Sequence, residues 1–599
     1  MPQYKAPVRD IQFVMHELLN FEAHYDALPA YAGTNRDLID GIAEAAADFC
    51  ENELSPINRS GDQEGCTFDN GVVTTPKGFK EAYKKYVELG YPSLSVPVEH
   101  GGQGLPGSLG TMVSEMVGTA NWSWGMYPGL SHGAVRTIEH HGSPEQQELY
   151  LSKLVTGEWT GTMCLTESHA GSDLGIIRTK AEPNADGSYA ITGQKIFISA
   201  GEHDMADNIV HIVLARLPGA PKGTKGISLF IVPKFNVNAD GSVGTRNTVA
   251  CGSIEHKMGI HGNATCVIVF DEAKGYLIGP ENKGLNCMFT FMNVARIGTA
   301  VQGLAASEGS FQGALTYAKD RLAMRSLTGP KALDKEADPI IVHPAVRNML
   351  LTQKAFAEGG RALVYFLTQF ADVVEVSQDA EQRKAADDML SLLTPIAKAF
   401  LTETGSESAK HGVQVYGGHG FIAEWGMEQI VRDTRIACLY EGTTEIQALD
   451  LLGRKVLATQ GAMLRNFTKI IHKFCEANAG NAAMAEFLQP LAALNKEWGD
   501  LTTRIGMKAM QNPDEVGAAA VDYMYFSGYV TLAYLWARMV SVSLEKLAGD
   551  TTERAFYEAK VKTAQFYFKK ILPRTQSHVA SIDTGVETLM AMDVDQFAF

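Results

Sequence analysis

A short stretch late in the chain, LYEGTTEIQ at residues 439–447, places a carboxylate, a glycine and two hydroxyls together after a long apolar-patterned segment. Gly442 has no Cβ, so the backbone can turn sharply there and a ligand can approach the main chain closely. Beside Tyr440 and this turn, the Glu441 carboxylate would be partly desolvated, which raises its pKa towards the range useful for abstracting a weakly acidic proton. We interpret Glu441 as a catalytic base, although the stretch taken alone would better fit an ordinary acidic loop residue.

Three other stretches combine residue types that suit contact with a planar, phosphate-bearing ligand. They are CLTESHAGSD at residues 164–173, TGQKIFIS at residues 192–199 and QVYGGHGF at residues 414–421. Small side chains and backbone groups can meet a ring and a pyrophosphate without crowding them. Taken singly, a helix N-cap for Ser172 and strand packing for Phe197 would each be the better interpretation.

These four stretches, in this order, resemble those of the acyl-CoA dehydrogenase family. The similarity runs from about residue 37 to residue 455, and the flanks resemble those of the long bacterial members. The resemblance implies an FAD cofactor, an acyl-CoA substrate and no metal. Matched position by position, the cofactor-binding residues would be Met163, Leu165, Thr166, Gly171, Ser172, Phe197, Ile198, Ser199, Arg321, Gln414, Tyr416, Gly417, Gly418, Thr443 and Glu445. The substrate-binding residues would be Ser172, Asn293, Arg296 and Gly442, with Glu441 as the catalytic residue.

The resemblance also assigns individual roles. Thr166 would hydrogen-bond the pyrimidine side of the flavin, Phe197 would lie against the ring, and Ser199 would bring a hydroxyl to the redox nitrogen. Arg321 and residues 414–418 would reach the flavin largely across a dimer interface. Arginine suits phosphate contacts because its fork donates two hydrogen bonds at once.

The chain departs from the family pattern at a few positions. Some branches of the family carry the catalytic base at the position of Ala295. Alanine cannot accept a proton, so Glu441 has no competitor as the candidate base. Pro344 replaces a glutamine that touches the cofactor in many relatives, so we expect that contact to be lost or replaced. His169 gets no catalytic role, and for His419 a loop hydrogen bond is the better interpretation than acid–base chemistry.

The reaction implied by the resemblance is α,β-dehydrogenation of an acyl-CoA thioester to a trans-2-enoyl-CoA. Glu441 would remove the α-proton while a hydride passes from the β-carbon to flavin N5, and an electron-transferring flavoprotein would reoxidise the flavin. The acyl group would be fatty or similar to 3-methylmercaptopropionyl, as in fatty acid β-oxidation. The alternatives are an acyl-CoA oxidase, a DNA-associated flavoprotein of the same fold and a purely structural helical protein.

The elements that must position these residues follow from the patterning of the chain. Before residue 158, apolar residues recur every three or four positions, which predicts helices. After it, runs of β-branched residues separated by turn residues predict an antiparallel β domain. We expect an α+β chain with five parts: a leader at 1–33, a helical domain at 34–158, a β domain at 159–280, a helical bundle at 281–455 and a further helical domain at 456–599. The match to G-x-G-x-x-G at residues 102–107 lacks a βαβ context, so we interpret it as a loop.

Composition limits the remaining possibilities. A chain of 599 residues exceeds what one core supports, and a net charge of -16 argues against general nucleic-acid binding. Eight scattered cysteines suggest free thiols in a reducing cytosol. We see no targeting segment, and the apolar run at 523–537 is too short to span a membrane, so a buried helix is preferred. We therefore expect a cytoplasmic enzyme, and from the family's long members a homodimer.

Overall fold

The computed structural model describes residues 4–598, and the chain separates into two compact units. The first, here called the sheet unit, comprises Asp37–Gly298 together with residues 4–6. The second, here called the helical unit, comprises Pro7–Arg36 and the described chain from Thr299 onward. The expected fold class is confirmed: helices, a central sheet, a helical bundle and an additional C-terminal helical region follow one another along the chain.

The sheet unit begins with helices. They are α3 (Arg36–Phe49), α4 (Ser55–Glu64), α5 (Phe79–Glu88), α6 (Gly107–His141) and α7 (Pro144–Val155). Helix α6 is interrupted at Asn121, whose non-helical backbone lets its side chain accept a hydrogen bond from the Trp124 amide. The glycine motif before α6 is a loop, as expected, because a 3-10 turn at Val98–His100 precedes it where a nucleotide-binding fold needs a strand.

A seven-stranded sheet follows, in the order β3-β6-β7-β11-β5-β4 with β10 paired to β11. Its strands are β3 (Trp159–Cys164), β4 (Lys180–Pro183), β5 (Tyr189–Ser199), β6 (Asn208–Ala215), β7 (Ser228–Pro233), β10 (Val249–Ile254) and β11 (Thr265–Ile278). All pairs are antiparallel except β3 and β6, which run parallel because β4 and β5 intervene between them in the chain. Apolar clusters cover both faces, and α6 and α7 contribute to one of them. Two small hairpins complete the unit, β1 (Thr67–Asp69) with β2 (Val72–Thr74) and β8 (Phe235–Val237) with β9 (Val243–Arg246).

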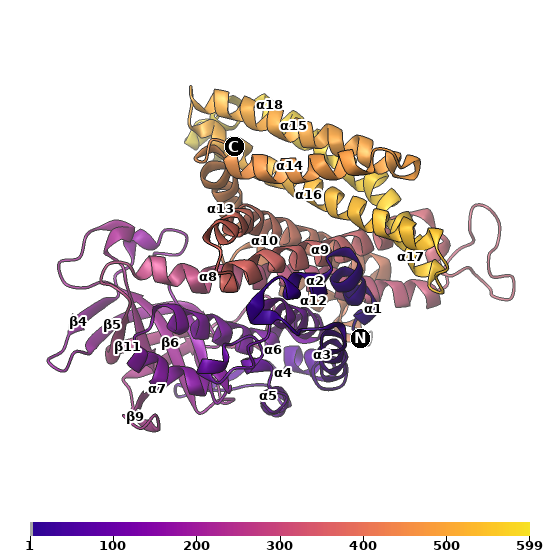
Figure 1. The fold of residues 1–599 in the computed structure, drawn as a ribbon. Helices are drawn as coiled ribbons and strands as arrows, with labels where there is room; N and C mark the ends of the chain where they lie inside the picture. The colour runs from indigo at the N-terminus through magenta and orange to yellow at the C-terminus, as the bar shows by residue number, and fades with distance from the viewer. Residues whose placement is uncertain (1–3, 599) are drawn as a thin grey trace. The chain divides into compact units, whose positions relative to one another are not determined.

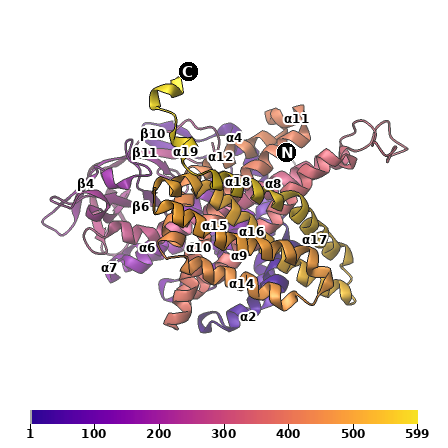
Figure 2. The same cartoon turned by 90° about the horizontal axis from the view of Figure 1, so that it is seen from above.

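The helical unit contains two groups of helices. The bundle is formed by the later part of α8 (Gly284–Asp320) with α9 (Pro344–Val376), α10 (Ala380–Tyr416), α11 (Gly418–Phe421), α12 (Met427–Arg435) and α13 (Thr444–Leu449). Between α8 and α9 a long loop projects from the helix ends (Figure 2). Pro344 is the first residue of α9, a position where its missing N–H costs nothing.

The C-terminal extension is helical throughout and packs around α16. Its helices are α14 (Ala462–Asn478), α15 (Ala485–Ala509), α16 (Asp514–Ala548), α17 (Arg554–Phe566), α18 (Thr575–Thr584) and α19 (Glu587–Met590). Figure 1 shows α14, α15 and α16 lying side by side. The apolar run at 523–537 lies inside α16 and is almost wholly buried, which confirms the core-helix interpretation. Within residues 4–598 no helix is long and apolar enough to cross a membrane.

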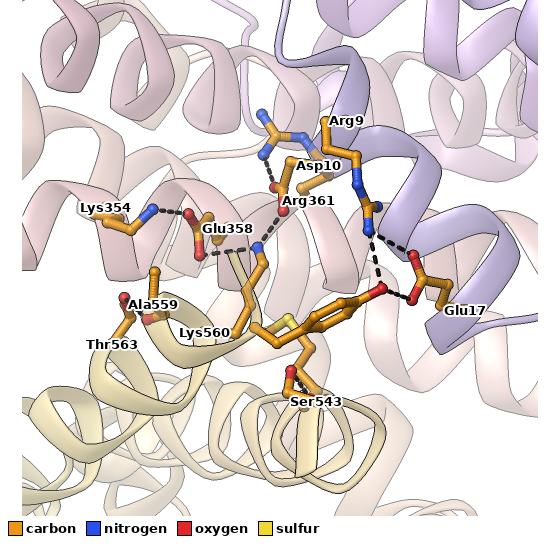
Figure 3. Close-up of polar contacts among 12 residues, drawn as sticks. Arg9, Asp10, Glu17, Lys354, Glu358, Arg361, Ser543, Ala559, Lys560 and Thr563 are labelled. Atoms are coloured by element: carbon orange, nitrogen blue, oxygen red, sulfur yellow. Dashed lines mark hydrogen bonds and ion pairs between the residues drawn. The ribbon is translucent and has the colours of Figure 1, made fainter. Parts of the chain in front are cut away.

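The leader is more tightly built into the helical unit than its sequence suggested. It contains α1 (Val8–Gln12) and α2 (Phe21–Asp26). Asp10 on α1 forms buried ion pairs with Arg361 on α9 and Lys560 on α17, and Lys560 also reaches Glu358 at 2.9 Å (Figure 3). Burial by itself raises the pKa of Asp10, but the two cations outweigh it and hold that pKa below its ordinary value. The leader therefore joins the bundle to the extension.

Candidate active site

The loop that carries Glu441 has a strained backbone. Glu441 has φ +56° and Gly442 has φ +87°, so two consecutive residues are left-handed between the short turn at Ile436–Cys438 and α13. For a residue with a side chain this conformation costs roughly 1–2 kcal/mol and persists only where the surroundings enforce it. Gly442 is required for a second reason, because a Cβ there would lie 2.6 Å from Nε2 of Gln447.

The two flanks of this loop are anchored to the bundle. On one side, the Tyr440 hydroxyl donates to Oε1 of Gln302 on α8. On the other, Thr443 caps α13 by accepting from the Ile446 amide, and the Thr444 hydroxyl donates to Glu403 on α10 at 2.6 Å. The half-buried Glu441 carboxylate is thus presented from a loop with fixed ends.

In the sheet unit, Phe197 has the geometry expected of a residue that contacts a ligand ring. It is 59% exposed and has φ +59°, an unusual combination for a large aromatic residue in a strand. The ladder between β5 and β11 slips here, so that two β5 residues oppose one residue of β11. Such bulges re-aim side chains near functional sites. Ser199, two residues further along the strand, is half-buried.

The loop after β3 is held against β5 by a buried ion pair that the sequence analysis missed. Nζ of Lys195 donates to Oε1 of Glu167 and to the carbonyl of Leu165, each at 2.9 Å. Glu167 also accepts from the amide and the hydroxyl of Thr179. Burial tends to raise the pKa of Glu167, but the Lys195 charge and these hydrogen bonds lower it to about 2. Glu167 and Lys195 lie inside two of the recognised motifs. A carboxylate in one motif and a lysine in the other were the signal from which this ion pair could have been predicted.

The other residues that were predicted to bind the cofactor from this loop differ in how exposed they are. Gly171 and Ser172 are exposed, and Thr166 and Met163 are half-buried. The cap that Ser172 offered as an alternative is made by Asp173, which accepts from the Gly175 amide. Leu165 and Ile198 are buried in the apolar clusters, so only their main chains are available to a cofactor.

At the end of α10, Gln414, Gly417 and Gly418 are exposed, whereas the Tyr416 side chain is buried. The Tyr416 ring stacks on Tyr317 at 4.1 Å and its hydroxyl donates to the Gly313 carbonyl, so Tyr416 can contact a cofactor only through its main chain. His419 shares a 2.8 Å hydrogen bond with the Tyr317 hydroxyl, which confirms the expected loop hydrogen bond.

Two predicted arginines have guanidinium groups that suit a ligand. Nε of Arg296, in the part of α8 that belongs to the sheet unit, is buried and makes no hydrogen bond to the described chain. Arg321 directly follows α8 and is exposed. Asn293 and Glu445 are exposed as well. A buried donor without a partner is costly in the folded state, so Arg296 fits a polar ligand at this position.

Four neighbouring residues of α6 could either pack in the core or shape an acyl tunnel: Trp122, Trp124, Met126 and Tyr127. Trp124 is fully buried and donates to the Phe79 carbonyl at 3.0 Å. Tyr127 is also fully buried and donates to the Gly262 carbonyl. These two side chains are therefore part of the core.

Comparison with known proteins agrees with this fold. Four family models match in order: the N-terminal, middle and C-terminal domains of acyl-CoA dehydrogenase at residues 39–158, 162–273 and 282–457, and an acetyl-CoA dehydrogenase C-terminal-like domain at residues 467–593. The chain belongs to the acyl-CoA dehydrogenase family. It is 42% identical to 3-methylmercaptopropionyl-CoA dehydrogenase of Ruegeria pomeroyi, over 98% of this chain and 99% of the relative.

Two further similarities extend over nearly the whole chain. Butyryl-CoA dehydrogenase of Syntrophomonas wolfei is 35% identical over 100% of this chain and 99% of its own. The crystal structure of an acyl-CoA dehydrogenase complexed with FAD from Bacillus anthracis superposes with a TM-score of 0.74 at 23% identity, covering 95% of this chain and 90% of that one. The C-terminal extension is therefore part of the shared architecture.

Proposed function

We propose that the protein oxidises an acyl-CoA thioester to the trans-2-enoyl-CoA with Glu441 as the base. The observation that carries this proposal is the left-handed backbone of Glu441, held in a loop with anchored ends. Backbone strain at a carboxylate, in a chain of this family, is typical of a residue whose position matters for chemistry. In this reaction Glu441 takes the α-proton of the thioester.

The residues of the sheet unit fit an FAD cofactor. The exposed Phe197 offers a ring surface, Ser199 and Thr166 offer hydroxyls, and the exposed Gly171 and Ser172 offer main-chain donors without bulk. FAD, when bound there, supplies the acceptor for the hydride that leaves the β-carbon. From the helical unit, Thr443, Glu445, Arg321, Gln414, Gly417 and Gly418 would contact the cofactor, the last four from the second subunit of a homodimer.

The remaining residues hold the substrate. Arg296 and Asn293 would bind the CoA and acyl portion together with Ser172, while Gly442, which has no side chain, would let the thioester approach the main chain. The Glu441 amide would donate to the thioester carbonyl, where negative charge develops as the α-proton leaves. This donor stabilises the transition state more than the ground state, which is how it accelerates the reaction.

The acyl group we propose is short or medium, either fatty or a thioether resembling 3-methylmercaptopropionyl. Support comes from the two relatives named for 3-methylmercaptopropionyl-CoA and butyryl-CoA. By family resemblance, electrons pass to an electron-transferring flavoprotein in the cytoplasm, as in fatty acid β-oxidation. By the family resemblance, the C-terminal extension occupies the place where a second dimer would otherwise dock, so we propose a homodimer.

The test is anaerobic bleaching of the yellow holoenzyme by straight-chain, branched and thioether acyl-CoAs. We expect loss of flavin absorbance with a preferred acyl-CoA, and turnover only with an artificial or flavoprotein acceptor. Rapid formation of hydrogen peroxide in air would instead identify an acyl-CoA oxidase. Glu441→Gln should keep its FAD but lose bleaching, and full bleaching by that variant would remove the assignment of the base.

A further inference from the structure

Two buried side chains hold the carbonyl groups next to Glu441. Nζ of Lys398, on α10, donates to the Gly442 carbonyl at 2.6 Å. Nε2 of Gln447, on α13, donates to the Glu441 carbonyl at 2.8 Å. Lys398 is 0% exposed and Gln447 is 1% exposed, so neither side chain is a mobile surface group. Both contacts lie within the helical unit.

These contacts fix the torsions that present the Glu441 carboxylate. The Glu441 carbonyl belongs to the peptide plane between residues 441 and 442, and the Gly442 carbonyl to the next plane. Holding both planes fixes ψ of Glu441, both torsions of Gly442 and φ of Thr443. Thr443 begins α13, and Tyr440 is anchored on the other side of the loop. The two contacts therefore constrain ψ of Glu441, and the anchored Tyr440 lies on the side of the loop that sets its φ.

An ammonium group suits this position for a physical reason. A charged donor makes a stronger and shorter hydrogen bond to a carbonyl than a neutral donor does, particularly when it is buried. A lysine also reaches the loop from α10, which is a long helix packed against α9 and is itself rigid. The Lys398 hydrogen bond, the stronger of the two contacts, therefore links the loop to α10, which packs extensively against α9.

We propose that Lys398 is a positioning residue for the proton abstraction, acting through the Gly442 carbonyl to hold Glu441 in its left-handed conformation. This inference rests on the proposed function of Glu441. Lys398 touches neither the substrate nor the cofactor in this account. Its loss lets the loop relax to a right-handed or extended backbone, which moves the carboxylate away from the α-carbon while leaving the ligand contacts of the sheet unit intact.

The test compares Lys398→Met, Lys398→Arg and the matched control Lys384→Met. Lys384 is an exposed lysine on the same helix that pairs with Asp388. FAD content and melting temperature are measured first. Stopped-flow bleaching by the preferred acyl-CoA then gives the rate constant of flavin reduction and the Kd of the acyl-CoA. The isotope effect with α-deuterated substrate reports how far proton removal limits that rate.

We expect Lys398→Met to keep its FAD and its acyl-CoA Kd but to reduce flavin roughly 10²-fold more slowly, the size of effect that a misplacement of about 1 Å produces. Its α-deuterium isotope effect should rise, and Lys398→Arg should recover part of the rate. A lysine with a merely structural role would lower melting temperature and FAD content together without changing the isotope effect. Reduction at the rate of Lys384→Met would overturn the proposal.

A second variant covers the case in which Lys398→Met does not fold. Gln447→Met removes the hydrogen bond to the Glu441 carbonyl and should give the same slow flavin reduction and raised isotope effect. A normal rate of flavin reduction in Gln447→Met would refute the proposal that these contacts position Glu441. Failure of the proposed function is distinguishable from both results, because in that case the wild-type protein and Lys384→Met would not be bleached either.

Discussion

Replacing Asp10 with Asn should destabilise the helical unit, because Arg361 and Lys560 lose a shared carboxylate and the buried cluster is left with one positive charge in excess, although Glu308 still pairs with Arg361 and Glu358 with Lys560. Asp10 is 9% exposed, Lys560 is 2% exposed and Arg361 is fully buried. Removing one partner from a buried ion pair costs about 3–5 kcal/mol. At about 2.1 cal/mol/K per residue, the roughly 330 residues of this unit have an unfolding entropy near 0.7 kcal/mol/K, so Tm should fall by about 6 °C.

The assay is differential scanning calorimetry of wild type, Asp10→Asn and the control Asp583→Asn. Asp583 pairs with Arg504 on the surface, with both side chains over a third exposed, so its loss should cost only about 0–1 kcal/mol. The folded-state pKa of Asp10 lies below its ordinary value, so its stabilisation is complete above the unfolded pKa of about 3.9 and is lost as pH falls through the folded pKa. The difference between wild type and Asp10→Asn should therefore be constant from pH 8 to pH 5.

Equal melting temperatures for Asp10→Asn and Asp583→Asn would refute this reasoning, since the leader would then contribute no buried electrostatic energy. A second check is Asp10→Asn combined with Lys560→Met, which removes the excess positive charge. That double variant should recover part of the loss, because Glu358 keeps its other partner, Lys354.

Two further predictions concern the sheet unit. Lys195→Met leaves the Glu167 carboxylate buried without its cation, so the loop at 164–173 should loosen; equilibrium dialysis should show weaker FAD binding, and unchanged FAD affinity would contradict the assigned role of the pair. Phe197→Gly removes an exposed ring from a left-handed position, so the apoprotein Tm should stay equal or rise while FAD retention on gel filtration falls. A lower Tm with normal FAD retention would show that Phe197 serves strand packing instead.

The sequence predicted which stretches would carry the site but not how their residues are held in place. The four motifs fall at a strand end, on a strand, at a helix end and in a loop. Phe197 was expected to lie against the flavin ring, and its exposed side chain fits that expectation. The left-handed φ of Glu441 was not foreseeable, because a backbone torsion at a residue with a side chain follows from surrounding contacts and leaves no local pattern.

The sequence analysis also missed contacts between residues that lie far apart in the chain. Lys398 precedes Gly442 by more than forty residues, and Asp10 meets Lys560 near the opposite end of the chain, so neither contact produces a spacing that can be read from the sequence. Tyr416 was predicted to contact the cofactor, and periodicity alone could not show that its ring packs on Tyr317 inside the bundle, which leaves its main chain for that contact.

Exchange of the substrate α-proton with solvent is the most direct test of the central claim that Glu441 removes it. Holoenzyme is incubated anaerobically in D₂O with its preferred acyl-CoA, and deuterium at the α-carbon is followed by mass spectrometry. Wild type should incorporate deuterium and Glu441→Gln should not, although both bind the acyl-CoA and FAD. Incorporation by Glu441→Gln at the wild-type rate would contradict the account.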